Sequence, residues 1–234
     1  MKAIIQLLAA SVLSAKAFAA GPENPFSNYF SVGFGENAPF IRELTTTLVL
    51  PTINPRQKGF LKLYPELYTN ASASLTGTAL TLLDDRNPCL DNLYDWCVGA
   101  RLVLGNAQNS GEYVPAPHDT KLEIKVSYDD ATKKHLQQVS IDGKVVSSLP
   151  VTSEDNLVAG RGIGFRTQIE CQLDACGAVS SHSYVDTRIV LDSADPSFGS
   201  TKDVLRTTGD LKTADGGLTW TIDEIVVMSY TYDI

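Results

Sequence analysis

Alternation of apolar and polar residues is the strongest pattern in the chain. In residues 121–129, Leu122, Ile124 and Val126 alternate with polar positions. Successive side chains of a strand point to opposite faces, so a period of two indicates strands half-buried in a sheet. Similar runs recur along the sequence with turn residues between them, including a predicted hairpin turn at Asp142-Gly143. The pattern predicts an all-β fold, a two-sheet antiparallel β-sandwich of the jelly-roll kind.

Residues 160–191 contain two predicted strands, each with an apolar and a polar face. The polar positions are Arg166, Gln168 and Glu170 in the first strand, and Tyr184, Asp186 and Arg188 in the second. This polar face is either a solvated exterior with weak cross-strand ion pairs or the floor of a binding cleft. Glu170 and Asp186 are also a possible carboxylate pair for sugar cleavage, which requires a suitable separation.

Four more side chains are candidates for the border of such a cleft. His182 directly precedes the second strand and would titrate near neutrality there, although a lone histidine is more often structural. Trp96 precedes Cys97, and it either packs in the core against a disulfide or forms an apolar wall for a ligand. Tyr64 and Tyr68 could line the mouth of the same cleft.

The net charge and the first twenty residues of the chain limit the classes of function that the protein can have. The 234 residues carry a formal net charge of -8, which argues against nucleic-acid binding because phosphate contacts need a basic surface. Residues 1–20 have a lysine, an apolar run and a small-x-small site, as in a secretory signal peptide. We expect one β-sandwich domain in residues 21–234, no membrane span, and a secreted or vesicular location.

Secretion changes how the cysteines are interpreted. An even number of cysteines in an oxidising compartment implies two disulfides, and we favour the local pairs Cys89–Cys97 and Cys171–Cys176 among the three possible pairings. A zinc site is a weaker interpretation because the spacings lack a CxxC pair, so no metal is expected. Asn70 begins an Asn-x-Ser site in a polar loop, which predicts surface glycosylation.

Several segments together resemble a known group of proteins. They are TTTLVLP at 45–51, GFLKLYPELYT at 59–69, the Trp96-Cys97 pair, the loop between Cys171 and Cys176, and WTIDEIVV at 220–227. Their layout resembles small secreted fungal proteins with a concanavalin A-like jelly roll, and among these the hetero-Diels–Alderases of tropolonic sesquiterpenoid biosynthesis. The likeness spans nearly the whole mature chain and rests on pattern and layout, without a short diagnostic motif.

This resemblance implies an intermolecular hetero-Diels–Alder reaction between a tropolone o-quinone methide and a humulene-type alkene, with no cofactor. The enzyme would hold both partners in register and donate hydrogen bonds to the quinone methide oxygens. Arg166, Gln168 and Tyr184 are the candidate donors, and Trp96 and Tyr64 the candidate terpene wall. His182 or a carboxylate would help to expel water and so generate the quinone methide.

Two other functional classes remain open. A secreted glycan-binding or glycan-cleaving jelly roll would use an open groove with exposed aromatic rings and a carboxylate pair. A cycloaddition site would instead be a closed, mostly apolar pocket with a few donors. A secreted surface protein without enzymatic activity would have neither kind of site. The oligomeric state is not predicted.

Overall fold

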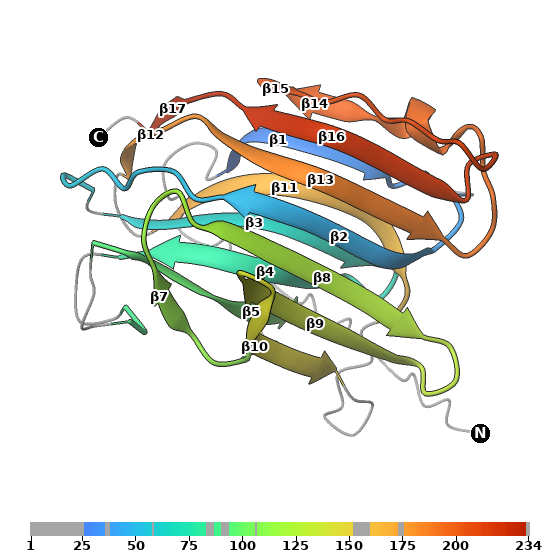
Figure 1. Ribbon diagram of the computed structural model, residues 1–234, viewed down its shortest axis with the longest axis horizontal. Helices are drawn as coiled ribbons and strands as arrows, with labels where there is room; N and C mark the ends of the chain where they lie inside the picture. Colours follow the sequence, from blue (N-terminus) through green and yellow to red (C-terminus); the bar gives the residue numbers. More distant parts are fainter. Residues whose placement is uncertain are drawn as a thin grey trace, which may run out of the picture.

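The chain folds as two antiparallel β-sheets packed face to face in a computed structural model (Figure 1). The structure describes residues 26–35, 38–57, 59–82, 87–89, 94–105, 107–151, 160–172 and 176–232. The front sheet, in its strand order, consists of β10 (Lys144–Val151), β9 (Lys134–Ile141), β8 (Lys121–Asp129), β2 (Ile41–Val49), β13 (His182–Leu191), β16 (Thr219–Val227) and β15 (Thr207–Thr208).

The second sheet lies behind the first in the view of Figure 1, and we call it the rear sheet. Its strands, in order, are β14 (Asp203–Leu205), β1 (Phe26–Gly33), β11 (Gly162–Gln172), β3 (Phe60–Thr69), β4 (Ala73–Thr81) and β5 (Trp96–Leu104), with β6 (Ala107–Ser110) and β7 (Val114–Ala116) both paired to β5. A single pairing between Ile41 and Gly162 joins the two sheets at one corner. The architecture confirms the predicted all-β jelly-roll sandwich.

The hydrophobic core fills the space between the sheets. Fully buried apolar side chains from both sheets form one cluster, for example Leu63 and Phe165 of the rear sheet and Leu48 of the front sheet. At Gly77 the sheets approach so closely that a Cβ would lie 2.6 Å from Ile124. Close interdigitation of this kind leaves the outer face of each sheet free for polar residues.

The predicted hairpin at Asp142-Gly143 is confirmed. It joins β9 to β10, which pair in an antiparallel ladder from Lys144 opposite Ile141 onward. Both turn residues have a positive φ, 51° at Asp142 and 72° at Gly143. Two-residue hairpin turns need this left-handed backbone, which aspartate tolerates and glycine adopts freely.

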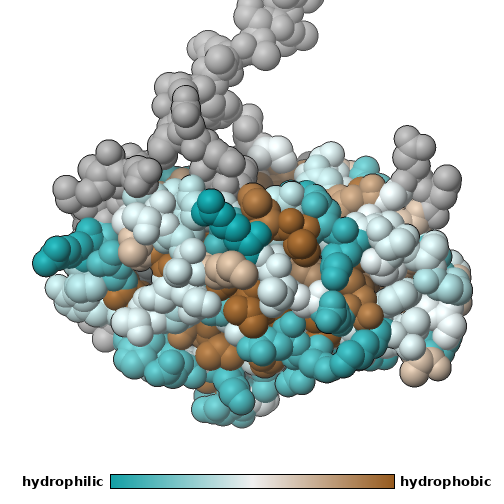
Figure 2. Space-filling model, turned by 90° about the horizontal axis from the view of Figure 1, so that it is seen from above, coloured by the Kyte–Doolittle hydropathy of each residue, from teal (hydrophilic) through white to brown (hydrophobic). Residues whose placement is uncertain are grey.

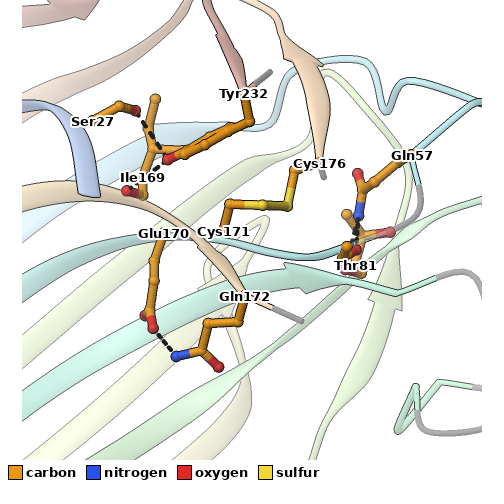
Figure 3. The surroundings of a disulfide bond; sticks show 10 residues. Ser27, Gln57, Thr81, Ile169, Glu170, Cys171, Gln172, Cys176 and Tyr232 are labelled. Atoms are coloured by element: carbon orange, nitrogen blue, oxygen red, sulfur yellow. Dashed lines mark hydrogen bonds between the residues drawn. A yellow bond between two sulfur atoms is a disulfide. The ribbon is translucent and has the colours of Figure 1, made fainter. Parts of the chain in front are cut away.

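The structure forms both local disulfides that the sequence analysis favoured. Cys89 bonds to Cys97 at the start of β5, and Cys171 bonds to Cys176 where the chain leaves β11. Figure 3 shows the second bond near Tyr232 of β17 (Tyr230–Tyr232), whose hydroxyl lies 3.0 Å from Ser27 Oγ. β17 pairs with β12 (Gly177–Val179), the strand that follows this disulfide. The bond thus fixes the end of β11 beside the carboxyl-terminal strand.

The prediction that β11 and β13 share one polar face is wrong. β13 pairs with β2 and β16 in the front sheet, whereas β11 pairs with β1 and β3 in the rear sheet. In addition, Asp186 has a φ of 54°, and the register of β13 against β2 shifts between Val185 and Arg188. A bulge of this kind changes which face the following side chains occupy. As a result Tyr184 points into the core, and Asp186 and Arg188 point to solvent.

The edge of the sandwich around β14 to β17 exposes some apolar side chains. Figure 2 looks onto this edge and shows small brown areas between hydrophilic ones. Val204, Leu205 and Met228 are the exposed large apolar residues of β14 and of the turn after β16. In the described residues, no helix is both long and apolar enough to cross a bilayer. The predicted signal peptide lies outside the described residues, while the two disulfides fit an oxidising compartment.

Candidate functional site

The outer face of the rear sheet holds a pocket of about 710 Å³. Directly opposed residues of neighbouring strands point to the same face, so the sheet register arranges the lining in rows. One row, which we call the central row, runs across four strands as Arg166 of β11, Glu66 of β3, Thr76 of β4 and Arg101 of β5. The pocket volume lies in the range of typical small-molecule sites.

A buried ion pair occupies one end of the pocket. Lys62 Nζ lies 2.8 Å from Glu170 Oε2, and both side chains are at least nine-tenths buried. The Tyr64 hydroxyl donates to Gln168 Oε1 at 2.7 Å and lies 3.1 Å from the same carboxylate oxygen of Glu170. Gln172 Nε2 donates to the other oxygen, Oε1 (Figure 3). Burial lowers the pKa of Lys62, and the Glu170 charge opposes this shift. The ammonium group of Lys62 therefore balances the charge of Glu170, and hydrogen bonds from Tyr64 and Gln172 hold the carboxylate in place.

Glu66 is the carboxyl group best suited to carry a proton. It is 8% exposed, and burial raises its pKa, which a hydrogen bond with Ser74 and the charge of Arg166 partly offset. A carboxyl group with a raised pKa that opens into a cavity is a candidate general acid. Glu66 was not among the site residues predicted from the sequence, although its alternation with Tyr64 and Tyr68 along β3 places all three on one face.

Arg166 lies at the opposite end of the central row from Arg101. Its guanidinium carbon is 4.9 Å from the centre of the Phe34 ring and 5.9 Å from that of Tyr29. The Phe34 ring lies directly over Gly164, where a Cβ would be only 2.4 Å from the ring. A glycine at this point of β11 thus lets an aromatic ring lie flat beside the cation. The result is a hydrogen-bond donor next to an apolar surface.

A smaller recess of about 260 Å³ continues the pocket past β5. Arg101 and Gln108 line both cavities, and Arg101 Nη2 donates to Gln108 Oε1 at 2.5 Å. The recess is bordered by Phe60 and Tyr113, the latter lying over Gly99. The two cavities therefore form a groove that crosses the rear sheet from β1 to β6.

Five of the predicted site residues line this pocket, namely Arg166, Gln168, Glu170, Tyr64 and Tyr68. The other five do not. Trp96 is a core residue whose Nε1 donates to the Pro51 carbonyl at 2.6 Å, and His182, Tyr184, Asp186 and Arg188 belong to the front sheet. Asp186 therefore does not face Glu170, which excludes them as a carboxylate pair.

His182 and Tyr184 are buried, unlike a residue at the rim of a cleft. Burial lowers the pKa of His182 to about 4 and raises that of Tyr184. The Nε2 atom of His182 and the hydroxyl of Tyr184 are buried and have no hydrogen-bond partner. The neutral forms of both side chains are stabilised, and neither can reach a ligand in the pocket.

Asn70 is exposed in the turn between β3 and β4, where its Oδ1 accepts a hydrogen bond from the Arg161 backbone at 2.8 Å. Its glycosylation stays a prediction. Among the described residues, no cluster of three His, Cys, Asp or Glu side chains could bind a metal ion. The described lining of the pocket offers hydrogen-bonding groups, the buried carboxyl group of Glu66 and aromatic rings.

No protein-family model and no curated protein matches the sequence. Among solved structures, the fold is similar to Scytalido-glutamic peptidase in complex with a peptide-based transition state analog. The TM-score is 0.56 at 10% identity, over 87% of this chain and 99% of that chain. A family 16 endo-glucanase from Bacteroides ovatus matches with a TM-score of 0.38 at 11% identity, over 64% of this chain and 70% of that one.

A legume lectin-like domain from Entamoeba histolytica matches with a TM-score of 0.36 at 8% identity, over 90% of this chain and 83% of that chain. At these identities the similarities concern the fold alone. The similarity to Scytalido-glutamic peptidase agrees with the β-sandwich architecture described above.

Proposed function

We propose that the pocket on the rear sheet binds a glycan, and that Glu66 is the general acid if the bound glycan is cleaved. The observation that carries this proposal is the groove itself, in which half-buried aromatic rings alternate with amide and carboxyl groups. Tyr64 and Tyr68 lie on one strand, two positions from Glu66 on either side. Sugars bind to such surfaces because ring faces stack on their C–H groups while polar side chains bind their hydroxyls.

A binding experiment tests the glycan proposal directly. The purified mature protein is applied to a glycan array, and hits are quantified by calorimetry. Tyr68→Ala should weaken binding about three- to tenfold, since an aromatic contact contributes about 0.5–1.5 kcal/mol. Tyr94→Ala is the matched control, because Tyr94 is 76% exposed and lies outside the pocket. No glycan binding by the wild-type protein would refute the proposal.

Cleavage is a separate question with its own test. New reducing ends are measured with the bound glycan, and a peptide substrate is included because one structural neighbour is a peptidase. Glu66→Gln should lower the rate at least a hundredfold while leaving binding nearly unchanged, as expected for a general acid. Glu123→Gln, on the exposed outer face of β8, is the control and should behave as wild type. Binding without cleavage by the wild-type protein would make the protein a lectin-like binder.

A second candidate is the hetero-Diels–Alder reaction, which the corner around Arg166 favours. A guanidinium beside Phe34 and Tyr29 would donate to a quinone methide oxygen while the rings contact the terpene. Glu66 replaces His182 as the group that would protonate a leaving hydroxyl. The test is incubation with a tropolone precursor and a humulene alcohol, analysed by chiral chromatography. A product mixture identical to the no-protein control would exclude this reaction for those substrates.

A further inference from the structure

The central row has a guanidinium group at each end. Arg166 and Arg101 are separated by Glu66 and Thr76, one residue on each intervening strand. Neighbouring strands are about 4.8 Å apart, so the two arginine backbones are about 14 Å apart along the row. The guanidinium of Arg166 lies toward Tyr29 of β1 and that of Arg101 toward Gln108 of β6, on opposite sides of the row. Successive units of an extended ligand can therefore contact both.

Neither arginine has an ion-pair partner among the described residues. The guanidinium of Arg166 is stacked near Phe34 and Tyr29 and its Nε is buried without a hydrogen-bond partner. Arg101 donates to the neutral amide of Gln108. Arg42, Arg161 and Arg188 do have carboxylate partners, for example Arg188 with Glu43 at 2.8 Å. What distinguishes Arg166 and Arg101 is that both line one pocket.

Three carboxylates line the same pocket, and among the described residues only Glu170 is held in an ion pair. Glu170 is neutralised by Lys62 at 2.8 Å. Asp203 accepts a hydrogen bond from the Tyr29 hydroxyl at 2.9 Å at the exposed edge of the pocket. Glu66 is buried and bonded to Ser74, and its pKa is raised, so its charged form is disfavoured. Of the three cations that line the pocket, Arg166 and Arg101 are thus the two that no ion pair occupies in the part of the chain that the structure describes.

We propose that the ligand is an acidic glycan, a uronic acid oligomer whose carboxylates bind Arg166 and Arg101 on different sugar units. This inference rests on the proposed glycan function and names its substrate class. Arginine suits the role because its planar fork matches a carboxylate in a bidentate geometry. The aromatic rings of Tyr64 and Tyr68 flank Glu66 on β3 and also line the groove, where they would contact the sugar rings.

The test compares an oligogalacturonate with its fully methyl-esterified form, which has the same sugars without the charge. Calorimetry should give a dissociation constant for the acid at least tenfold lower than for the ester. Arg166→Gln and Arg101→Gln should each weaken binding of the acid roughly tenfold and leave the ester within twofold. Arg188→Gln is the matched control on the other sheet and should change neither value.

The outcomes separate this inference from the glycan proposal. Equal affinity for acid and ester, or equal losses for both ligands in the arginine variants, would overturn the acidic-ligand inference and leave glycan binding intact. Failure of the acid, the ester and the glycan array together would overturn both. The comparison of acid and ester with the wild-type protein tests the inference without any substitution. Unfolding curves of both arginine variants show whether a loss of binding comes from a folding defect.

Discussion

Strands β11 and β13 have the same alternation in sequence and different fates in the fold. In β11 the alternation is uninterrupted, and Arg166, Gln168 and Glu170 all point into the pocket. In β13 the positive φ at Asp186 breaks the alternation, so Tyr184 is buried while Arg188 is exposed. The difference shows that one residue with a left-handed backbone decides whether a polar face is continuous.

The two strands also bear ion pairs in opposite surroundings. Glu170 of β11 pairs with Lys62 of β3, and both side chains are almost fully buried. Arg188 of β13 pairs with Glu43 of β2, and their side chains are 46% and 27% exposed. Both pairs have the same separation of 2.8 Å. Burial, and not distance, should therefore determine what each contributes to stability.

The largest expected effect is that of Lys62→Met. The substitution leaves the buried Glu170 without a cation, which should lower the free energy of unfolding by about 3–5 kcal/mol. Urea unfolding at neutral pH measures this loss. The double variant with Glu170→Gln should regain much of the stability, since it removes the unpaired charge. A Lys62→Met protein as stable as wild type would contradict the assigned role of the pair.

The next effect is the pH dependence that His182 confers. Its pKa falls from its ordinary value near 6.5 to about 4 because the side chain is fully buried. Between these values the unfolded chain binds a proton that the folded chain excludes. Stability should thus fall by about 3 kcal/mol as the pH decreases from 6.5 to 4, and the loss is absent above 6.5.

His182→Leu isolates this contribution from those of other groups. His135, whose pKa burial also lowers, has the same sign, and Glu66, whose pKa burial raises, has the opposite sign. Urea unfolding of the wild type and the variant at several pH values gives the difference between their slopes. Parallel curves would mean that His182 is accessible to protons in the folded state.

Removing the hydroxyl group of Tyr64 or of Tyr184 should have smaller effects on stability, and the two effects should differ in sign. Tyr64→Phe removes hydrogen bonds to Gln168 and Glu170 and should cost about 1–3 kcal/mol. Tyr184→Phe removes a buried hydroxyl without a partner and should be neutral or stabilising by about 1 kcal/mol. Thermal unfolding of both variants tests the contrast. Equal losses would mean that the Tyr184 hydroxyl has a partner.

Sequence patterns predicted the strands better than they predicted the site. Alternation alone gave the polar face of β11, and turn chemistry gave the hairpin at Asp142. The bulge in β13 was missed because aspartate accepts both ordinary and left-handed backbone, so nothing in the local sequence marks it. The placement of β13 in the other sheet depends on long-range pairing, which a local pattern does not contain.

Other site residues were missed for the same reason. Arg101 and Glu66 face the pocket only because β3, β4 and β5 follow β11 in the sheet. Lys62 lies on the same strand as Glu66, but its carboxylate partner Glu170 comes from a segment more than a hundred residues away. Register between distant strands joins these groups, and tertiary packing sets that register.

The smallest expected effect is that of Arg188→Gln, which completes the comparison of the two strands. Its pair with Glu43 is half-exposed, and Glu43 keeps a second cation, Lys125 Nζ at 2.8 Å. Removing Arg188 should therefore change the free energy of unfolding by less than about 1 kcal/mol, and less still at high salt. Urea unfolding at low and high ionic strength is the measurement. A loss comparable to that of Lys62→Met would show that burial does not distinguish the two pairs.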